Sequence, residues 1–314
     1  MLVAPFVLLV LAFPGWLFAQ KQMAVTIDDL PWVERDRDTL RARQGTVDFL
    51  RTLKDAAVPA IGFVNADKIE GHPDSAAWSA MLRLWLEAGF DLGNHTYSHR
   101  DLNSLPPADY RREVIDGERP WRNWMQELRP RSTLYFRHPF THTGGSREKR
   151  TAFETFLAER GYRIAPFTVE NADYMFDWVR WKVAAAGDPQ LVKNVEAAYL
   201  AHHESMVDYF EKLSYSYFGR DVAQILLIHT NEINHRMLPA ILASIRKRGY
   251  RFVTLDEALR DPAYSTEDRY YGTNGPSWVH RWSISLGKQL DARNEPDPPA
   301  WFLDLERSLR AESK

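Results

Sequence analysis

The sequence contains no cysteine among its 314 residues, which excludes disulfide bonds. This absence neither supports nor opposes an oxidising compartment. An excess of one charge is also lacking, because 40 basic residues face 42 acidic ones and leave a formal net charge of −2. Nothing in this balance indicates a nucleic-acid partner or an anionic membrane surface. No internal repeat or low-complexity segment is visible. The length suits one large domain or two small ones.

The first 19 residues contain no lysine or arginine and read MLVAPFVLLVLAFPGWLFA. Their length and the Leu-Phe-Ala ending before Gln20 predict a secretory signal that is cleaved after Ala19. An uncleaved membrane anchor is the alternative, which the short length and two prolines disfavour. We therefore expect export to a periplasm or the cell exterior, with no transmembrane span in the mature chain.

What the sequence does contain is an ordinary globular composition, with 45% hydrophobic and 26% charged residues. From residue 23 to residue 259, short apolar runs alternate with segments of helical spacing. The predicted strands are 25–27, 60–65, 90–93, 133–137, 162–169, 224–228 and 250–255. This alternation predicts an α/β fold with a parallel sheet and outer helices, of the size of a (β/α) barrel.

Two segments do not fit the simple alternation. The stretch 175–220 is longer than a strand connection needs, and apolar residues at helical spacing run through 191–213. We expect a helical insertion there, beside the cleft. Residues 261–314 lack the alternation and are expected to form a C-terminal extension packed on the barrel. The remaining mature chain, 20–260, is predicted to be the catalytic domain.

Two adjacent carboxylates, Asp28 and Asp29, follow the first predicted strand. Neighbouring acids at a strand end repel each other and resist burial, so they need compensation. A divalent cation would provide it, because one carboxylate can bind the ion while the other stays free as a base. The alternative is a solvated turn, where Asp is common.

Unusual polar residues follow five of the predicted strands. They are Asp28 and Asp29 after the first, His95 and His99 after the third, Arg137 after the fourth, Asp173 after the fifth and His229 after the sixth. Barrel enzymes build their sites at this carboxyl-terminal face. One helical turn would point His95 and His99 in the same direction. With one carboxylate, they would form a metal site with open positions for water.

These residues lie in four short motifs: TIDD (26–29), HTYSH (95–99), RHPF (137–140) and ILLIH (225–229). Together they resemble the motifs of the polysaccharide deacetylases, the NodB-homology or carbohydrate esterase family 4 group. The motifs occur in the same order over about 23–259. The resemblance implies a deformed (β/α)7 barrel and metal-dependent hydrolysis of N- or O-acetyl groups.

The resemblance also implies roles for individual residues. The metal ligands would be Asp29, His95 and His99. Asp28 would be the general base, and His229 the acid that protonates the leaving group. Arg137 would orient Asp28, and an arginine beside a carboxylate is expected to lower its pKa and keep it ionised.

The sequence departs from the family pattern at several positions. Leu30-Pro31 replaces the glycine after the paired acids, and Phe140 replaces a tyrosine. The fourth motif is met only loosely, so either Asp173 or Asp177 could orient His229. Predicted substrate contacts are Pro139, Phe140 and Trp32. For Trp32, stacking on a sugar ring and packing in the wall are both open.

We therefore predict an exported, metal-dependent carbohydrate deacetylase that uses one divalent ion, with zinc expected. The same chemistry could instead serve a small amide, cyclic ureide or formyl substrate. A catalytically silent glycan-binding protein is the third reading. The sequence does not distinguish N- from O-deacetylation, and it is silent on the oligomeric state.

Overall fold

The computed structural model describes residues 20–33, 35 and 38–313. The predicted secretory signal, 1–19, lies outside the described residues. Within them, no helix combines the length and apolar character needed to cross a membrane.

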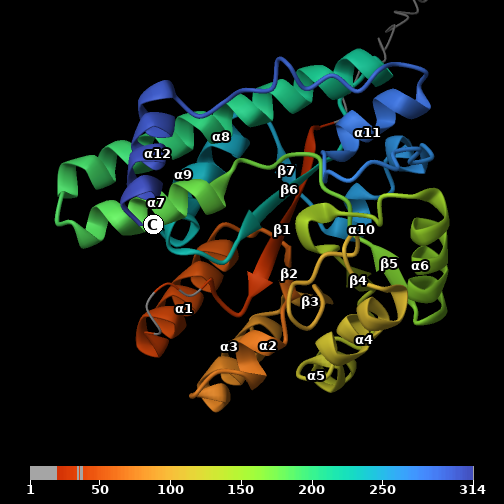
Figure 1. Ribbon diagram of the computed structural model, residues 1–314, viewed down its shortest axis with the longest axis horizontal. Helices are drawn as coiled ribbons and strands as arrows, with labels where there is room; N and C mark the ends of the chain where they lie inside the picture. Colours follow the sequence, from red (N-terminus) through yellow and green to blue (C-terminus); the bar gives the residue numbers. More distant parts are fainter. Residues whose placement is uncertain (1–19, 34, 36–37, 314) are drawn as a thin grey trace, which may run out of the picture.

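Seven parallel strands form one sheet around β1 (Gln22–Leu30), which pairs with β2 (Ala60–Val64), with β6 (Gln224–His229) and with the short β7 (Arg251–Phe252) (Figure 1). The sheet continues from β2 through three further strands. These are β3 (Asp91–Asn94), β4 (Leu134–Phe136) and β5 (Tyr162–Ile164). All seven predicted strands are present, and the prediction of a parallel α/β sheet is confirmed.

The chain after β5 closes the sheet toward a barrel. Ala165 still donates its N–H to the Phe136 carbonyl, and Val169 forms a parallel bridge with Leu226 of β6. The predicted strand 162–169 is therefore interrupted. Pro166 lies in the interruption and has no N–H for a strand ladder.

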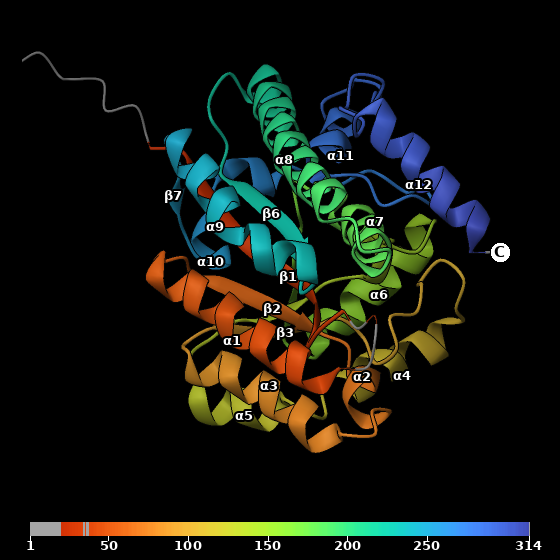
Figure 2. The same ribbon diagram turned by 90° about the vertical axis from the view of Figure 1, so that its left-hand side faces the viewer.

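Helices cover the outside of the sheet (Figures 1 and 2). They are α1 (Thr39–Asp55), α2 (Asp67–Glu70), α3 (Ser75–Glu87), α4 (Pro107–Gly117), α5 (Arg122–Leu128), α6 (Arg147–Glu159), α7 (Asp173–Ala185), α8 (Pro189–Phe218), α9 (Glu232–Lys247), α10 (Leu255–Ala258), α11 (Trp278–Ser285) and α12 (Ala300–Glu312). The sequence over 108–128 could form a single helix. Two helices occur there because Pro120 lies between α4 and α5 and cannot continue a helix.

The segment predicted as a helical insertion contains α7 and α8, and α8 alone has 30 residues. Asp188 accepts a hydrogen bond from the Leu191 N–H at the start of α8, and Gly219 ends it at a φ of 66°. The long α8 crosses the molecule above the strands (Figure 1). α12 packs on α7, where Phe302 stacks on Phe176 with ring centroids 4.0 Å apart. The C-terminal residues thus cover the insertion.

Candidate active site

The end of β1 brings both acids to one cavity. Successive strand residues normally point to opposite faces. Here Asp29 has a φ of 70°, and the register with β2 shifts between Ile27 and Leu30. The side chains of Asp28 and Asp29 consequently line the same cavity.

Three side chains at this position can hold a metal ion. The Oδ1 atom of Asp29 lies 3.7 Å from Nε2 of His95 and 3.7 Å from Nε2 of His99. The three ligand atoms all lie within 4.8 Å of one another. The two histidines do not share a helical turn as the spacing suggested. They converge from an irregular loop in which Thr96 and His99 have positive φ.

The chemistry of these donors fits a divalent cation. His95 donates Nδ1–H to the Arg137 carbonyl at 2.8 Å, which leaves Nε2 free as a ligand. Burial lowers the pKa of both His95 and His99 to about 4, so both rings are neutral at pH 7. Asp29 Oδ1 is buried without a hydrogen-bond partner. An ionised carboxylate oxygen left in this way requires a cation or another donor.

Asp28 is 2% exposed and lies beside Arg137, whose Nη1 is 3.9 Å from Asp28 Oδ2. The guanidinium is itself buried and donates from Nη2 to Thr26 Oγ1 at 2.8 Å. Burial raises the pKa of Asp28, and the opposing charges of Arg137 and His229 do not cancel that effect. Arg137 lowers the pKa of Asp28, as expected, but burial outweighs it. The net rise was not expected, because the sequence did not reveal how completely the carboxylate is enclosed.

His229 lies opposite Asp28 in the β1–β6 register. Its Nδ1 is 2.7 Å from Asp173 Oδ1, and its backbone N–H donates to Asp173 Oδ2 at 2.7 Å. Burial by itself would lower the pKa of His229, but the negative charge and hydrogen bond of Asp173 raise it to about 10. Asp177 instead accepts from Arg35 Nε at 3.0 Å and from the Ile233 N–H. The geometry thus pairs His229 with Asp173.

Sequence reasoning missed Lys68, which lies on the short helix α2. Its Nζ is 3.6 Å from Asp29 Oδ2 and donates to the Asp29 carbonyl at 2.8 Å. Burial tends to raise the pKa of Asp29, but Lys68 and the nearby histidines lower it. Lys68 belongs to none of the four motifs, so the sequence carried no sign of its position.

The three predicted substrate contacts lie in different environments. Phe140 is 55% exposed at the cavity, and its ring lies 4.6 Å from His99, centroid to centroid. Pro139, the preceding residue, is buried. Trp32 is 4% exposed and packs so closely on Gly45 that a Cβ there would lie 2.4 Å from its ring. Trp32 therefore belongs to the core, and its predicted contact with a sugar ring is corrected to the wall-packing role.

The cavity has a volume of about 760 Å³ and two walls of different origin. We call the first the rim; it comprises strand-end residues, namely Asp28, Asp29, His95, His99 and His229. We call the second the outer wall; it comprises Glu170, Tyr174, Trp178, Phe210 and, from the C-terminal residues, Gly275, Pro276, Ser277, His280, Ala292, Glu295 and Arg310.

Hydrogen bonds hold the C-terminal residues against Thr141 and Thr168. Thr141 donates Oγ1–H to the Gly275 carbonyl at 2.7 Å, and Arg281 donates to the Thr141 carbonyl at 2.8 Å. Ser277 donates to the Thr168 carbonyl at 2.7 Å. A Cβ at Gly275 would lie 2.0 Å from the Phe140 carbonyl oxygen, so this close approach requires glycine.

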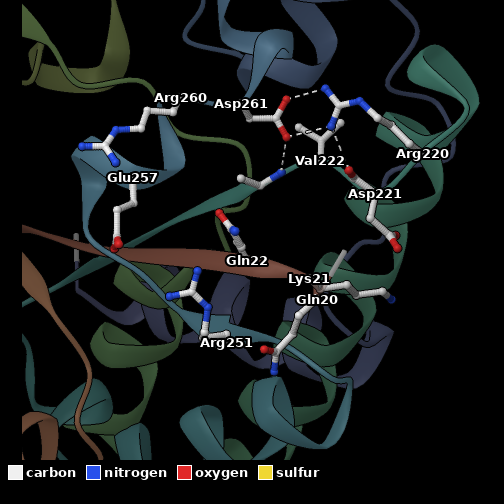
Figure 3. A pocket seen from close by; sticks show the side chains of 11 residues that line it. Gln20, Lys21, Gln22, Arg220, Asp221, Val222, Arg251, Glu257, Arg260 and Asp261 are labelled. Carbon is white, nitrogen blue, oxygen red and sulfur yellow. Dashed lines mark hydrogen bonds and ion pairs between the residues drawn. The ribbon is translucent and has the colours of Figure 1, made fainter. Parts of the chain in front are cut away.

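A second cavity, of about 350 Å³, lies at the opposite end of the barrel (Figure 3). It is lined by residues at or just before the amino ends of β1, β6 and β7, by Glu257 of α10 and by the residues that follow α10. Its most strongly bonded pair is Arg220 with Asp261, and Asp261 also accepts from the Ala223 N–H at 2.9 Å. No histidine lines it. The only group of His and acidic side chains arranged for a metal among the described residues is the one at the rim.

Comparison with known proteins agrees with this geometry. Residues 18–163 match the family described as polysaccharide deacetylase. A curated relative, a peptidoglycan-N-acetylglucosamine deacetylase of Bacillus cereus, is 26% identical over 246 residues, which cover 77% of this chain and 89% of the relative.

Solved structures show the same fold at low sequence identity. A carbohydrate esterase family 4 pseudoenzyme from Bacillus anthracis aligns with a TM-score of 0.51 at 16% identity, over 77% of this chain and 66% of that protein. A mutant of the same pseudoenzyme with restored enzymatic activity aligns with a TM-score of 0.51 at 17% identity, over 77% and 68%. The fold is thus the (β/α)7 type of this family, which confirms the predicted fold class.

Proposed function

This chain belongs to the polysaccharide deacetylases of the NodB, or carbohydrate esterase family 4, type, and we propose that it is a metal-dependent hydrolase that removes acetyl groups from an N-acetylated carbohydrate. One observation carries the proposal. The Asp29–His95–His99 cluster, a second carboxylate and a charged histidine all line one cavity. This is the set of groups that metal-assisted hydrolysis of an acyl group needs.

Asp29, His95 and His99 would hold the ion. Two imidazole nitrogens and one carboxylate oxygen suit zinc in a catalytic site, and we propose zinc as the native ion. A divalent ion at this position supplies Lewis acidity, which lowers the pKa of water and polarises an acyl oxygen. Lys68 keeps Asp29 ionised, and the Arg137 carbonyl fixes the orientation of the His95 ring.

The other two rim residues would move protons. Asp28 would take the proton of the attacking water, since its Oδ1 is buried without a partner. His229 would give a proton to the departing amine, because Asp173 keeps its ring charged through neutral pH. Arg137 and Asp173 act through these residues, so we regard both as positioning residues.

We further propose that residues 20–260 form the catalytic domain with the insertion at about 175–220, and that 261–314 completes its cavity. Export remains a proposal that rests on the predicted secretory signal. The proposal also states N-deacetylation in preference to O-deacetylation, because an amine is the poorer leaving group and gains most from a charged histidine acid.

A small acylated molecule, such as an amide or cyclic ureide, is a second candidate substrate. The observation that favours it is the outer wall. Its residues, from α7, α8 and the C-terminal segment, line the same cavity as Asp29, His95 and His99. The chemistry of the rim would be the same for either substrate.

The test is a panel of acetylated oligosaccharides, acetylated monosaccharides and cyclic amides, with and without chelator. We expect acetate release from acetylated sugars that the chelator abolishes. Asp28→Ala and His95→Ala should both abolish release, whereas His72→Ala, which alters a histidine outside the cavity, should not. Undiminished release after either rim substitution would refute the proposal.

A silent binding protein of the same fold is the remaining alternative, since a solved structural neighbour is itself described as a pseudoenzyme. Such a protein would bind acetylated sugars in the same panel without releasing acetate, even with stoichiometric zinc. The presence of a complete ligand set, base and acid in this chain supports turnover.

A further inference from the structure

The outer wall contains two acidic side chains without a basic partner. Glu170 lies between the Val169 bridge and α7, and its carboxylate accepts a hydrogen bond from the Ala172 N–H at 2.9 Å. Glu295 lies in the connection between α11 and α12, and its nearest cationic candidate is His280 at 3.8 Å. No lysine or arginine among the described residues forms an ion pair with either carboxylate.

The basic residues that share the cavity are already engaged. Arg35 donates to Asp177 at 3.0 Å. Arg310 bonds with Glu306 and lies over the Trp178 ring, 4.5 Å from its centroid. Burial lowers the pKa of His280 to about 4, so its ring is neutral at pH 7. The two carboxylates therefore have no cationic partner within the outer wall, and the opposing charge that acts on Glu170 is that of His229 at the rim.

The two acids also influence each other. Burial, followed by the charge of Glu170, raises the pKa of Glu295 to about 7. Burial likewise raises the pKa of Glu170. Two carboxylates that repel each other across a cavity are stabilised when a cation lies between them.

An independent observation indicates a polar ligand in the same cavity. Asn231 is 1% exposed and lines the cavity beside His229. Its Oδ1 accepts from the Asn234 N–H, but its Nδ2 is buried without a partner. A buried amide donor left unsatisfied is uncommon, and an acceptor oxygen of a bound sugar would satisfy it.

We propose that the outer wall is a binding position for a cationic amino sugar adjacent to the acetylated unit, with Glu170 and Glu295 accepting hydrogen bonds from its ammonium group. The exposed ring of Tyr174 provides a flat face for the sugar. A neighbouring unit that bears a carboxylate is repelled. This inference rests on the proposed function and specifies its substrate class.

The inference has a consequence for the order of events on a glycan. Each N-deacetylation creates a free amine, which is ionised at neutral pH. When that unit occupies the outer wall, the adjacent acetylated unit lies at the rim. The product of one turnover is therefore a better substrate than the fully acetylated chain, and deacetylated units should occur in runs.

The test compares three disaccharides whose reacting unit is the same N-acetylated sugar and whose second unit bears an acetamide, a free amine or a carboxylate. For the native protein, we expect kcat/KM to be highest with the amine and lowest with the carboxylate. Hydrogen bonds to a charged group predict that Glu170→Gln and Glu295→Gln each reduce the amine-to-carboxylate preference about tenfold or more. Glu204→Gln, an exposed acid on α8, should leave the preference unchanged.

Binding of the doubly deacetylated disaccharide, measured by calorimetry on the zinc-loaded protein, provides a readout that does not depend on turnover. The inference predicts about tenfold weaker binding to Glu295→Gln than to the native protein. Equal preferences for the three disaccharides, or equal binding by the variant, would overturn it while acetate release still supports the deacetylase. Absence of acetate release from all three would refute the proposed function, and the binding result would still decide whether the amine position exists.

Discussion

The rim and the outer wall of the cavity differ in how they are built, and the proposed function gives them different roles. The rim residues follow parallel strands, so the sheet register fixes them, as in the pairing of Asp28 with His229. The outer wall comes from two helices and a C-terminal segment that are held by side-chain and backbone hydrogen bonds. The comparison suggests a division of labour, in which the rim performs the chemistry and the outer wall selects the substrate.

The largest effect is expected at the rim, from Asp28→Asn. The amide cannot take a proton from water, so kcat should fall by about 10²–10⁴-fold. The substitution leaves Asp29, His95 and His99 in place, and we therefore expect stoichiometric zinc in the variant. Steady-state acetate release and metal analysis of the same sample measure both quantities. A loss of metal together with activity would show that Asp28 is a ligand instead.

Asp173→Asn tests whether the buried carboxylate of Asp173 raises the pKa of His229. In the native protein the pKa of His229 is raised to about 10, so the proton is held across neutral pH. Without the negative charge of Asp173 the pKa of His229 falls, so the His229 ring loses its proton at a lower pH. We expect the alkaline limb of the pH–kcat profile to move to lower pH, with a decrease in kcat of about tenfold to a hundredfold at pH 8.

The comparison variant for this experiment is Asp177→Asn. Asp177 pairs with Arg35 and not with His229, so its loss should leave the alkaline limb where it is. An unshifted limb in Asp173→Asn would mean that Asp173 only shapes the loop.

Gly275→Ala tests the contact that holds the C-terminal segment against Phe140 and Thr141. The new Cβ would lie 2.0 Å from the Phe140 carbonyl oxygen and from Thr141 Oγ1, so the C-terminal segment must move away. We expect a loss of about 1–3 kcal/mol in the free energy of unfolding and a rise in KM with a smaller change in kcat. Urea unfolding and substrate saturation curves measure these effects.

Gly287→Ala is the matched control in the same segment. Nothing lies within 4 Å of its Cβ position, although its φ of +71° disfavours alanine. It should cost about 1 kcal/mol of stability and leave KM unchanged. A KM that rises equally in both variants would indicate general loosening of the segment and not loss of the Gly275 contact.

The last prediction concerns the stability of α8, the helix that contributes Phe210 to the outer wall. Burial lowers the pKa of His203, on α8, from 6.5 to about 3. As the pH falls, His203 therefore takes up a proton in the unfolded chain before it does so in the folded protein. The stability that the neutral ring contributes is complete above pH 6.5 and is lost as the pH falls toward 3. The slope from one such group is at most about 1.4 kcal/mol per pH unit.

His203→Gln retains an acceptor for Asn171 Nδ2, which bonds His203 Nδ1 at 3.1 Å, and removes the titration. The free energy of unfolding should depend less on pH between 6.5 and 4.5 in the variant, as measured by urea unfolding. An equal slope in both proteins would assign the acid sensitivity to other buried histidines.

The sequence predicted the rim well because strand periodicity and parallel pairing place strand ends at one edge. Asp28 and His229 follow from that rule alone, whereas Asp29 shares the cavity because of its positive φ and the register shift beside it. The choice between Asp173 and Asp177 required the start of α7, where only Asp173 faces β6. Likewise, positive φ at Thr96 and His99 makes a loop where the spacing suggested a helical turn.

The helical insertion was expected beside the cleft, but the individual residues of the outer wall could not be predicted from the sequence. Glu295 lies in a segment without periodicity, and its proximity to the rim depends on hydrogen bonds made by Gly275 and Ser277 with distant loops. Trp32 shows the opposite problem. Its position beside the paired acids suggested a sugar contact, but its ring packs against Gly45, which has no side chain in the way.

The central claim, that the rim is a metal-dependent deacetylase site, is tested most directly by acetate release from an N-acetylated oligosaccharide after treatment with chelator. We predict no release by the stripped protein and full recovery after one equivalent of zinc per chain, with no recovery in His99→Ala. Release by the stripped protein at the native rate, or an inactive protein that holds one zinc ion and binds the oligosaccharide, would contradict the claim.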